Sequence, residues 1–374
     1  MNKSKTGNLA KLVAFFVITV VLTCTVAYAA GEWQQQPNDT TSDNSDDNTE
    51  PSDDPSVNVD ENKTEEPPKE EIPEPPSIPE YLHYITGLEI TKDESYKKPL
   101  AFVLDPNAPL YSISTSYLTV ELPTESGTRL LCFTDEALEC GKIGSILPTR
   151  GYISSVASYF DAILLSNGDD GRVEAKKIIP SGGYLDLSDN IGYHYSEYND
   201  RIYTNKDLLT ALIKNTKTST VKVTSPAIPF DFNEYNAQKI TLSLSAENIM
   251  LYNSDSDTTS FIYDGVNGKY SVSKNDTALT DRINSEELSY DNVFILFANS
   301  VTHETSEYTE CVLDTTRGGT GKYATGGKYV DITWTVTSEG LLFFDEDGKK
   351  LTVNRGTSYI SFIKSSLSHK ISIK

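Results

Sequence analysis

Polar side chains whose chemistry suits anion binding gather between positions 105 and 150 of the sequence. Arg129 and Arg150 could together hold a phosphate or a carboxylate bidentately, while nearby carboxylates orient the two guanidinium groups. The alternative is a network of salt bridges that fastens loops to one another. The candidate residues of this predicted cleft are Asp105, Asn107, Glu121, Glu125, Arg129 and Arg150.

The same set suggests acid–base chemistry. Glu121 or Glu125 would act as the acid or base, and the arginines would stabilise charge that develops on a phosphorylated or glycosidic substrate. This chemistry requires the four side chains to converge on one cleft. If Glu121 and Arg129 point to opposite faces of their strands, the arrangement fails.

Short apolar runs predict the elements that would position these residues. Residues 100–104, 118–122 and 129–133 predict buried strands, residues 152–160 have helical spacing, and residues 162–165 predict another strand. A strand, helix, strand order indicates an α/β layer with some parallel pairing. In such sheets ligands bind near strand carboxyl ends and helix N-termini, where several candidate residues fall.

The helical signals stop after about Asn215. Before that point, Thr204 and Asp207 form a capping-box pattern ahead of a second amphipathic helix. Beyond it, residues 240–244 alternate as a strand does, and Asn-Gly, Asp-Gly and Gly-Gly turns separate further apolar runs. We therefore predict an α+β protein. An α/β domain with a partly parallel sheet would cover residues 81–225, and a mostly antiparallel all-β domain would cover residues 226–374.

A glycine-rich run lies within residues 315–334. A phosphate-binding loop would need a glycine at Thr316, a Ser or Thr at Tyr323, and a helix after the loop, but β-type alternation follows instead. The glycines are instead predicted to supply positive φ angles at a pair of hairpin turns. They are Gly318, Gly319, Gly321, Gly326 and Gly327.

The N-terminus predicts export. Residues 1–30 combine three early lysines with an uncharged run of about the length that spans a bilayer. A membrane anchor, a lipoprotein signal at Cys24, and cleavage after Ala29 remain open, and all three place the body outside the cytoplasmic membrane. Residues 31–80 are acidic and rich in proline, so they predict a disordered linker that holds more than half of the formal net charge of −22.

Cysteine and histidine allow few further sites. Cys132 and Cys140 flank a plausible hairpin turn, so they could form a disulfide in an oxidising compartment, or they could be free buried thiols. The spacing of the cysteines and the scattered histidines does not match a metal or catalytic signature, so no metal or cofactor is predicted. Acidic turns at residues 253–257 and 345–348 offer oxygens to Ca²⁺, and a strongly acidic chain argues against nucleic acid.

The order of several segments resembles the YerB-like family of Gram-positive extracytoplasmic proteins, many of them regarded as lipoproteins. The segments include KKPLAFVLDPN, ESGTRLLCF, KIGSILPTR and YTNKDLL, and then DNVFILFA, DTTRGGTGKYATGGKYVDITW and FFDEDGKKLTVNRGTSYISFI. The resemblance covers roughly residues 84–363. It implies a two-domain envelope protein of unknown biochemical activity.

The resemblance also implies which positions match the family pattern: Asn107, Glu121, Glu125, Thr128, Arg129, Arg150, Asp161, Tyr203 and Thr204. Residues 109–113, the two positions before Thr149, and Arg201-Ile202 depart from that pattern. These departures favour a binding or scaffolding role over a catalytic one. We expect a membrane-tethered module for a cell-wall component or protein partner. The alternative is an enzyme or carrier that acts on phosphorylated or glycosidic wall precursors.

Overall fold

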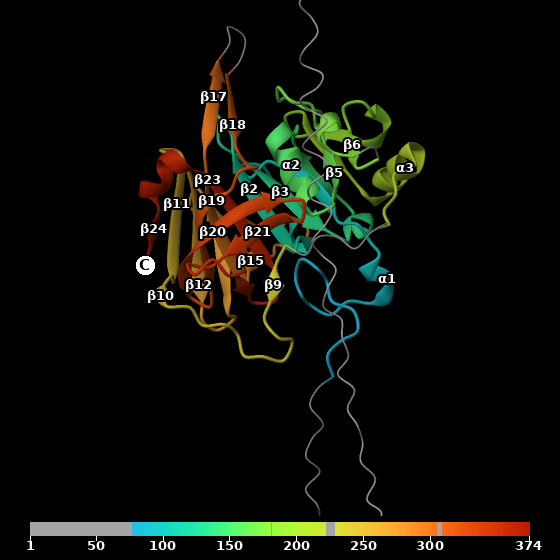
Figure 1. Cartoon of the computed structure of the whole chain (residues 1–374). Coiled ribbons are helices and arrows are strands. Elements are labelled where there is room, and N and C mark those ends of the chain that lie inside the picture. The colour runs from blue at the N-terminus through green and yellow to red at the C-terminus, as the bar shows by residue number, and fades with distance from the viewer. Residues whose placement is uncertain (1–76, 181, 222–228, 305–308) are drawn as a thin grey trace, which may run out of the picture. The chain divides into compact units, whose positions relative to one another are not determined.

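A 14-stranded mixed sheet runs through the body of the protein, which the computed structural model describes over residues 77–180, 182–221, 229–304 and 309–374 (Figure 1). Its continuous path consists of β10 (Leu244–Ser245), β20 (Lys328–Thr337), β19 (Gly319–Thr325), β16 (Asn292–Ala298), β23 (Ser358–Lys364), β2 (Leu118–Pro123), β3 (Thr128–Thr134), β1 (Leu100–Leu104), β4 (Ile143–Ile146), β8 (Arg201–Thr204) and β7 (Tyr195–Glu197). Three strands branch from this path: β21 (Gly340–Phe344), β5 (Ile163–Ser166) and β6 (Tyr184–Asp186).

The centre of this sheet joins the two halves of the chain. β23 lies between β16 and β2 and runs parallel to both, and Figure 1 shows β2 and β23 as neighbours. β5 is also parallel to its partners β1 and β6, so the predicted partly parallel sheet is present before residue 225. Because strands from both sides of residue 225 share one sheet, the predicted division is not visible as two separate sheets.

A second sheet of six strands comes entirely from the C-terminal part. It contains β14 (Thr277–Ala278), β13 (Lys269–Lys274), β12 (Asp257–Asp264), β11 (Asn248–Ser254), β24 (Ser372–Ile373) and β15 (Ser289–Tyr290). Two small pairs complete the strands: β17 (Ser300–Glu304) with β18 (Thr309–Leu313), and β9 (Asp231–Phe232) with β22 (Thr352–Val353). The β17–β18 ribbon extends beyond the rest of the body at the top of Figure 1.

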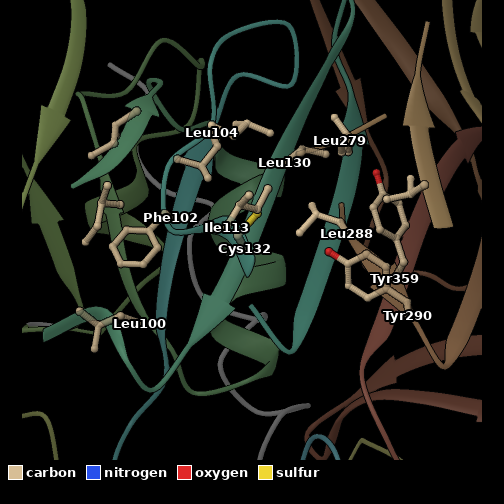
Figure 2. Packing of buried hydrophobic residues seen from close by; sticks show 14 of the residues in the cluster. Leu100, Phe102, Leu104, Ile113, Leu130, Cys132, Leu279, Leu288, Tyr290 and Tyr359 are labelled. Carbon is tan, nitrogen blue, oxygen red and sulfur yellow. The ribbon is translucent and has the colours of Figure 1, made fainter. Parts of the chain in front are cut away.

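Alternate residues of the large sheet face two different cores. On one face Phe102 and Leu130 share a core with Phe261 and Val272 of the six-stranded sheet. Figure 2 shows part of this first core, including Cys132 with Tyr290 and Tyr359. On the other face Ala101, Val103 and Leu131 pack against apolar residues of the helix α2 (Gly151–Tyr159). Burial on both faces explains why the central strands are continuous apolar runs rather than alternating ones.

The α-helices of the described residues are α1 (Lys92–Ser95), α2 (Gly151–Tyr159) and α3 (Lys206–Thr216). The helices predicted near residues 152–160 and after Thr204 are therefore present. The predicted N-cap is wrong by one residue, because Asn205 accepts the hydrogen bond from the Leu208 N–H while the Thr204 hydroxyl donates to the Tyr193 carbonyl oxygen.

The strand predicted over residues 240–244 is wrong for most of its length. Only Leu244 belongs to β10, because the Ile240 backbone instead bonds to a side chain: its N–H donates to Asn354 Oδ1 and its carbonyl accepts from Asn354 Nδ2. Backbone groups satisfied in this way do not need a neighbouring strand.

The glycine-rich run forms a β-hairpin, and β20 follows β19 without a helix. Gly326 and Gly327 form its turn with φ angles of 59° and 75°, and Gly318 has φ 86° before β19. The prediction of positive φ is wrong for Gly319 and Gly321, which lie within β19. There a Cβ atom would come within 2.3 Å of the Phe297 carbonyl oxygen or 2.6 Å of the Ile295 carbonyl oxygen. These two glycines are therefore required for close strand packing.

Residues 1–76 hold the predicted anchor and most of the predicted linker, and they lie outside the described part of the chain. Within residues 77–374, as far as they are described, the helices lack the length and apolar character needed to cross a bilayer.

Candidate functional site

Three of the predicted cleft residues meet in one cluster, which we call the arginine cluster: Arg129, Arg150, Glu125 and Asp170. Arg150 bonds to Glu125 through Nη1 at 2.5 Å and Nη2 at 2.7 Å, and its Nε bonds to Asp170 Oδ1 at 3.0 Å. Arg129 bonds to the two carboxylate oxygens of Asp170 at 2.9 and 2.6 Å, and to the Pro148 carbonyl oxygen at 2.7 Å. Asp170, which the sequence did not single out, thus bridges both arginines.

The electrostatics of this cluster favour full ionisation. Hydrogen bonds from Arg150 lower the pKa of Glu125 from 4.5 to about 2. Burial alone would raise the pKa of Asp170, but bonds from Arg129 and Arg150 lower it. Two cations therefore face two anions, and each guanidinium already has a bidentate carboxylate partner. An anionic ligand would have to displace Glu125 or Asp170. The arrangement is therefore the network of salt bridges between loops that the sequence analysis left open as the alternative to an anion site.

Glu121 does not belong to this cluster. In the β2–β3 pair Glu121 lies opposite Leu130, and Leu122 lies opposite Arg129, so Glu121 and Arg129 point to opposite faces of the sheet. The predicted convergence of Glu121, Glu125, Arg129 and Arg150 on one cleft is therefore wrong, and the acid–base arrangement that depended on it fails.

Glu121 instead enters a second group, the lysine cluster, together with Lys274 and Asp257. Lys274 Nζ donates to Glu121 Oε1 at 2.5 Å, to Asp257 Oδ1, and to Thr259 Oγ1 at 3.1 Å. Burial alone would raise the pKa of Glu121 and lower that of Lys274. Their mutual attraction outweighs burial, so the pKa of Glu121 is lowered and that of Lys274 is raised. The cluster joins β2 of the large sheet to β12 and β13 of the six-stranded sheet.

Asp105 and Asn107 lie in a third place, the loop after β1. Asp105 Oδ1 accepts the Asn107 N–H at 2.9 Å, and Asn107 Oδ1 accepts Asn275 Nδ2 at 3.3 Å. The six predicted cleft residues are thus divided among a turn and two separate charged clusters. Whether any of them binds a ligand stays a prediction.

The disulfide predicted between Cys132 and Cys140 is absent, and both residues are free buried thiols. The intervening segment is not a hairpin, because β3 pairs with β1 and β2, whereas β4 after Cys140 pairs with β1 and β8. The Cys132 thiol accepts from the Thr119 hydroxyl, and the Cys140 thiol donates to the Glu136 carbonyl oxygen. The alternative of free thiols therefore describes this structure.

The acidic turns do not form a cation site in the described residues. Asp257 turns inward to Lys274, Asp255 pairs with Lys370 at 3.3 Å, and Asp345 accepts the Lys349 N–H at 2.8 Å. Nowhere in the described part of the chain do three or more His, Cys, Asp or Glu side chains gather as metal ligands would.

A cavity of about 390 Å³ adjoins the arginine cluster, and we call it the ribbon pocket. It lies between the first turn of α2, the loop before residue 178, and the β17–β18 ribbon with the segment that follows it. One contact links it to the cluster: the Cys311 N–H of β18 donates to Glu125 at 3.3 Å. Within the pocket wall, the Arg172 N–H donates to Glu310 at 3.2 Å. Its volume lies in the range of small-molecule sites.

The walls of the ribbon pocket combine apolar and polar groups. Val173 and Val301 are more than half exposed there, and Arg172 and Arg317 stand at the rim. Asp314 is already bonded to the Thr316 N–H at 3.1 Å and to Arg317 at 3.3 Å, which partly neutralises it. Thr315 contributes to the wall, and its buried Oγ1 has no partner within the described residues.

Comparison with known proteins gives a family match for the C-terminal part of the chain and a solved structure with a similar fold. Residues 248–360, from the first residue of β11 into β23, match the family model described as the C-terminal domain of DUF3048, a protein of unknown function. The fold resembles the crystal structure of YerB protein from Bacillus subtilis, with a TM-score of 0.67 and 20% identity over 79% of this chain and 99% of that chain. Among curated proteins, none matches this sequence. The fold is thus YerB-like, and residues 248–360 match a family of unknown function, in agreement with the resemblance of the sequence segments.

Proposed function

We propose that the chain is a binding module of the cell envelope, held on the outer side of the cytoplasmic membrane by its N-terminal segment. The tether is supported by the lysines that precede the apolar run of residues 12–30 and by the acidic, proline-rich segment that follows it. Protease treatment of intact cells should degrade the body, whereas its protection until lysis would contradict this location.

The ribbon pocket is the observation that carries the binding role. It is a preformed concave site with apolar walls and a small number of polar groups, as in ligand pockets generally. The exposed Val173 and Val301 side chains suit an apolar moiety. The rim residues Arg172 and Arg317 suit an anionic group such as phosphate or carboxylate.

The ligand class follows from that division. An amphipathic cell-wall component, with an apolar body and one anionic end, would use both parts of the pocket. The arginine cluster supports the pocket rather than contacting the ligand, because its guanidinium groups are already paired with carboxylates. Its bonds fix the loop around Asp170 and the backbone of β18 at Cys311, which are two sides of the pocket.

Thermal denaturation of the purified protein tests the proposal. The panel would contain short polyprenyl phosphates, peptidoglycan fragments and pieces of anionic wall polymer. A ligand present at about a hundred times its Kd adds about 2.7 kcal/mol to stability, which raises the melting temperature measurably. No shift with any member would contradict a small-molecule role for the pocket.

Two matched substitutions locate the binding. Val301→Asp places a negative charge at an exposed position of the pocket wall, so it should abolish the shift caused by an anionic ligand. Val266→Asp makes the same change at a residue that is 93% exposed in the turn between β12 and β13, and it should leave the shift unchanged. Equal loss in both variants would mean that the ligand binds elsewhere.

A further inference from the structure

Lys274 holds its ammonium group among almost fully buried side chains. The side chain of Lys274 is 2% exposed, that of Glu121 is 0% and that of Asp257 is 7%. The Nζ atom contacts a carboxylate oxygen of each acid directly. An amine and two carboxylic acids are therefore confined together between the two sheets.

The backbone fixes this contact from three strands. Lys274 lies opposite Thr259 in the β12–β13 pair, and Asp257 precedes Thr259 by two residues, so all three side chains share the inner face of the six-stranded sheet. Glu121 reaches the same point from β2 of the large sheet. Lys274 and Asp257 therefore lie side by side on one sheet, and Glu121 faces them from the other.

The two acids are held differently. Glu121 is fixed by several donors besides Lys274: the Thr259 hydroxyl at 2.7 Å, the Ser361 hydroxyl at 3.1 Å and the Asn253 amide at 3.5 Å. The bonds found for the Asp257 side chain come from Lys274 and from Asn253, the latter at 3.3 Å. The hydrogen bonds to Glu121 therefore hold its carboxylate in place, whereas the Asp257 carboxylate is less restrained.

We propose that Lys274 and Asp257 join in an intramolecular amide bond, with Glu121 as the acid–base catalyst of its formation. The bond would be a permanent link between β12 and β13. It is a modification of the chain itself, independent of the ribbon pocket and of any ligand that binds there.

The reaction balances without an added reagent. A proton passes from the Lys274 ammonium to Asp257 along their hydrogen bond, and the free amine then attacks Asp257 Cγ. Glu121 takes a proton from the attacking nitrogen and returns it to the departing hydroxyl. The N–C bond forms, a C–O bond breaks, and one water molecule leaves, while Glu121 regains its starting state.

Two physical arguments favour this outcome over a lasting ion pair. Groups held in fixed contact react with a high effective concentration, which offsets the unfavourable equilibrium of amide formation in water. Amide formation also removes one cation and one anion from the interior, while the hydroxyls of Thr259 and Ser361 and the Asn253 amide still donate to Glu121. Because the pair is held in its charged form at first, the bond should form more slowly than the protein folds.

Chymotryptic peptide mapping by tandem mass spectrometry of the full-length protein tests the proposal. Cleavage after Tyr252, Phe261 and Tyr270 separates residues 253–261 from the peptide that begins at Ser271. If the amide forms, these two peptides appear joined, with a mass lower than their sum by one water molecule. This reading does not depend on how the N-terminus is processed.

Substitutions separate the roles of the three residues. Lys274→Arg keeps the charge but removes the reactive amine, and Glu121→Gln keeps the shape but removes the catalyst, so neither variant should contain the joined peptides. Asp257→Asn should still form the same amide, with loss of ammonia in place of water. The Lys98–Asp161 pair, with a contact of 2.8 Å, is more exposed than the lysine cluster, so it should remain unlinked and serves as the internal control.

The proposal is overturned if folded wild-type protein, stored for several days, yields the two peptides only as separate species. Finding Lys274 joined to Glu121 would overturn the assigned roles. If a variant does not give a cooperative melting curve, the wild-type map still decides the question.

Discussion

Arg150 illustrates how a charged residue is used in the interior of this protein. The residue is 4% exposed, yet its guanidinium bonds to both Glu125 and Asp170, and through Asp170 it is coupled to Arg129. A single side chain therefore connects the loop after β2, the start of α2 and the loop before residue 172. Its role is to fix these segments, which form one side of the ribbon pocket.

Arg150→Ala should destabilise the protein by about 3 kcal/mol, because it leaves the partly buried Glu125 carboxylate without its cation and leaves Asp170 with Arg129 alone. Arg150→Lys should recover little of that loss, since an ammonium cannot make the bidentate bond. Urea denaturation measures both changes. The matched control is Lys176→Ala, whose exposed pair with Asp189 should contribute less than about 1 kcal/mol. An equally small loss for Arg150→Ala would show that the cluster is not structural.

Glu125 should make stability depend on acid pH. Its folded-state pKa of about 2 is below the ordinary value of 4.5, so its contribution is complete above pH 4.5 and is lost as the pH falls towards 2. Glu125→Gln should therefore reduce the drop in the free energy of unfolding across that interval. Denaturation curves at several acid pH values test this, and identical pH profiles for both proteins would contradict it.

At the scale of elements, the β19–β20 hairpin shows why two adjacent glycines differ. Gly326 has a left-handed φ with open space around the position of a Cβ atom, whereas a Cβ on Gly327 would lie 2.7 Å from the Tyr263 ring. Asparagine tolerates left-handed backbone, but no side chain fits the second position.

Gly327→Ala should therefore lower the free energy of unfolding by more than about 1 kcal/mol, through backbone strain and contact with Tyr263. Gly326→Asn should stay within about 0.5 kcal/mol of the natural protein, because Asn visits this conformation readily. Thermal melting of the two variants decides between them. Similar losses at both positions would mean that steric contact with Tyr263 is not the cause.

The elements that sequence patterns predicted well are those with strong local signals. The apolar runs at residues 100–104, 118–122 and 129–133 are strands, and the spacing at residues 152–160 is a helix. Predictions failed where distant side chains decided the outcome, as with Asn354 at residue 240. The candidate site shows the same limit. The sequence predicted that Arg129, Arg150 and Glu125 lie together, but their partner Asp170 and the residues facing Glu121 come from segments with no local signal.

At the scale of the whole molecule, the central parallel strands unite the two halves of the chain. β2 pairs with β3 along one edge and with β23 along the other, and β23 lies far from β2 in the sequence. The lysine cluster adds a second connection between the halves, from β2 to β12 and β13. Near residue 225 the sequence pattern therefore changes from mixed helices and strands to strands alone, while the large sheet continues across this position.

A fragment that ends at residue 225 should not fold cooperatively, because it exposes the β23-facing edge of β2 and leaves Glu121 without Lys274. Circular dichroism during urea titration should show a broad, non-cooperative change. The full chain should show a single cooperative transition. A sharp transition in the fragment would establish the first predicted domain as independent.

The position of β23 has a consequence for the order in which the protein can be completed. A ribosome produces β2 long before β23, so the middle of the large sheet stays open while the segments between these two strands are being made. During that interval an apolar strand edge is available to other unfinished chains. We therefore expect chaperones that shield this edge to raise the yield of folded protein.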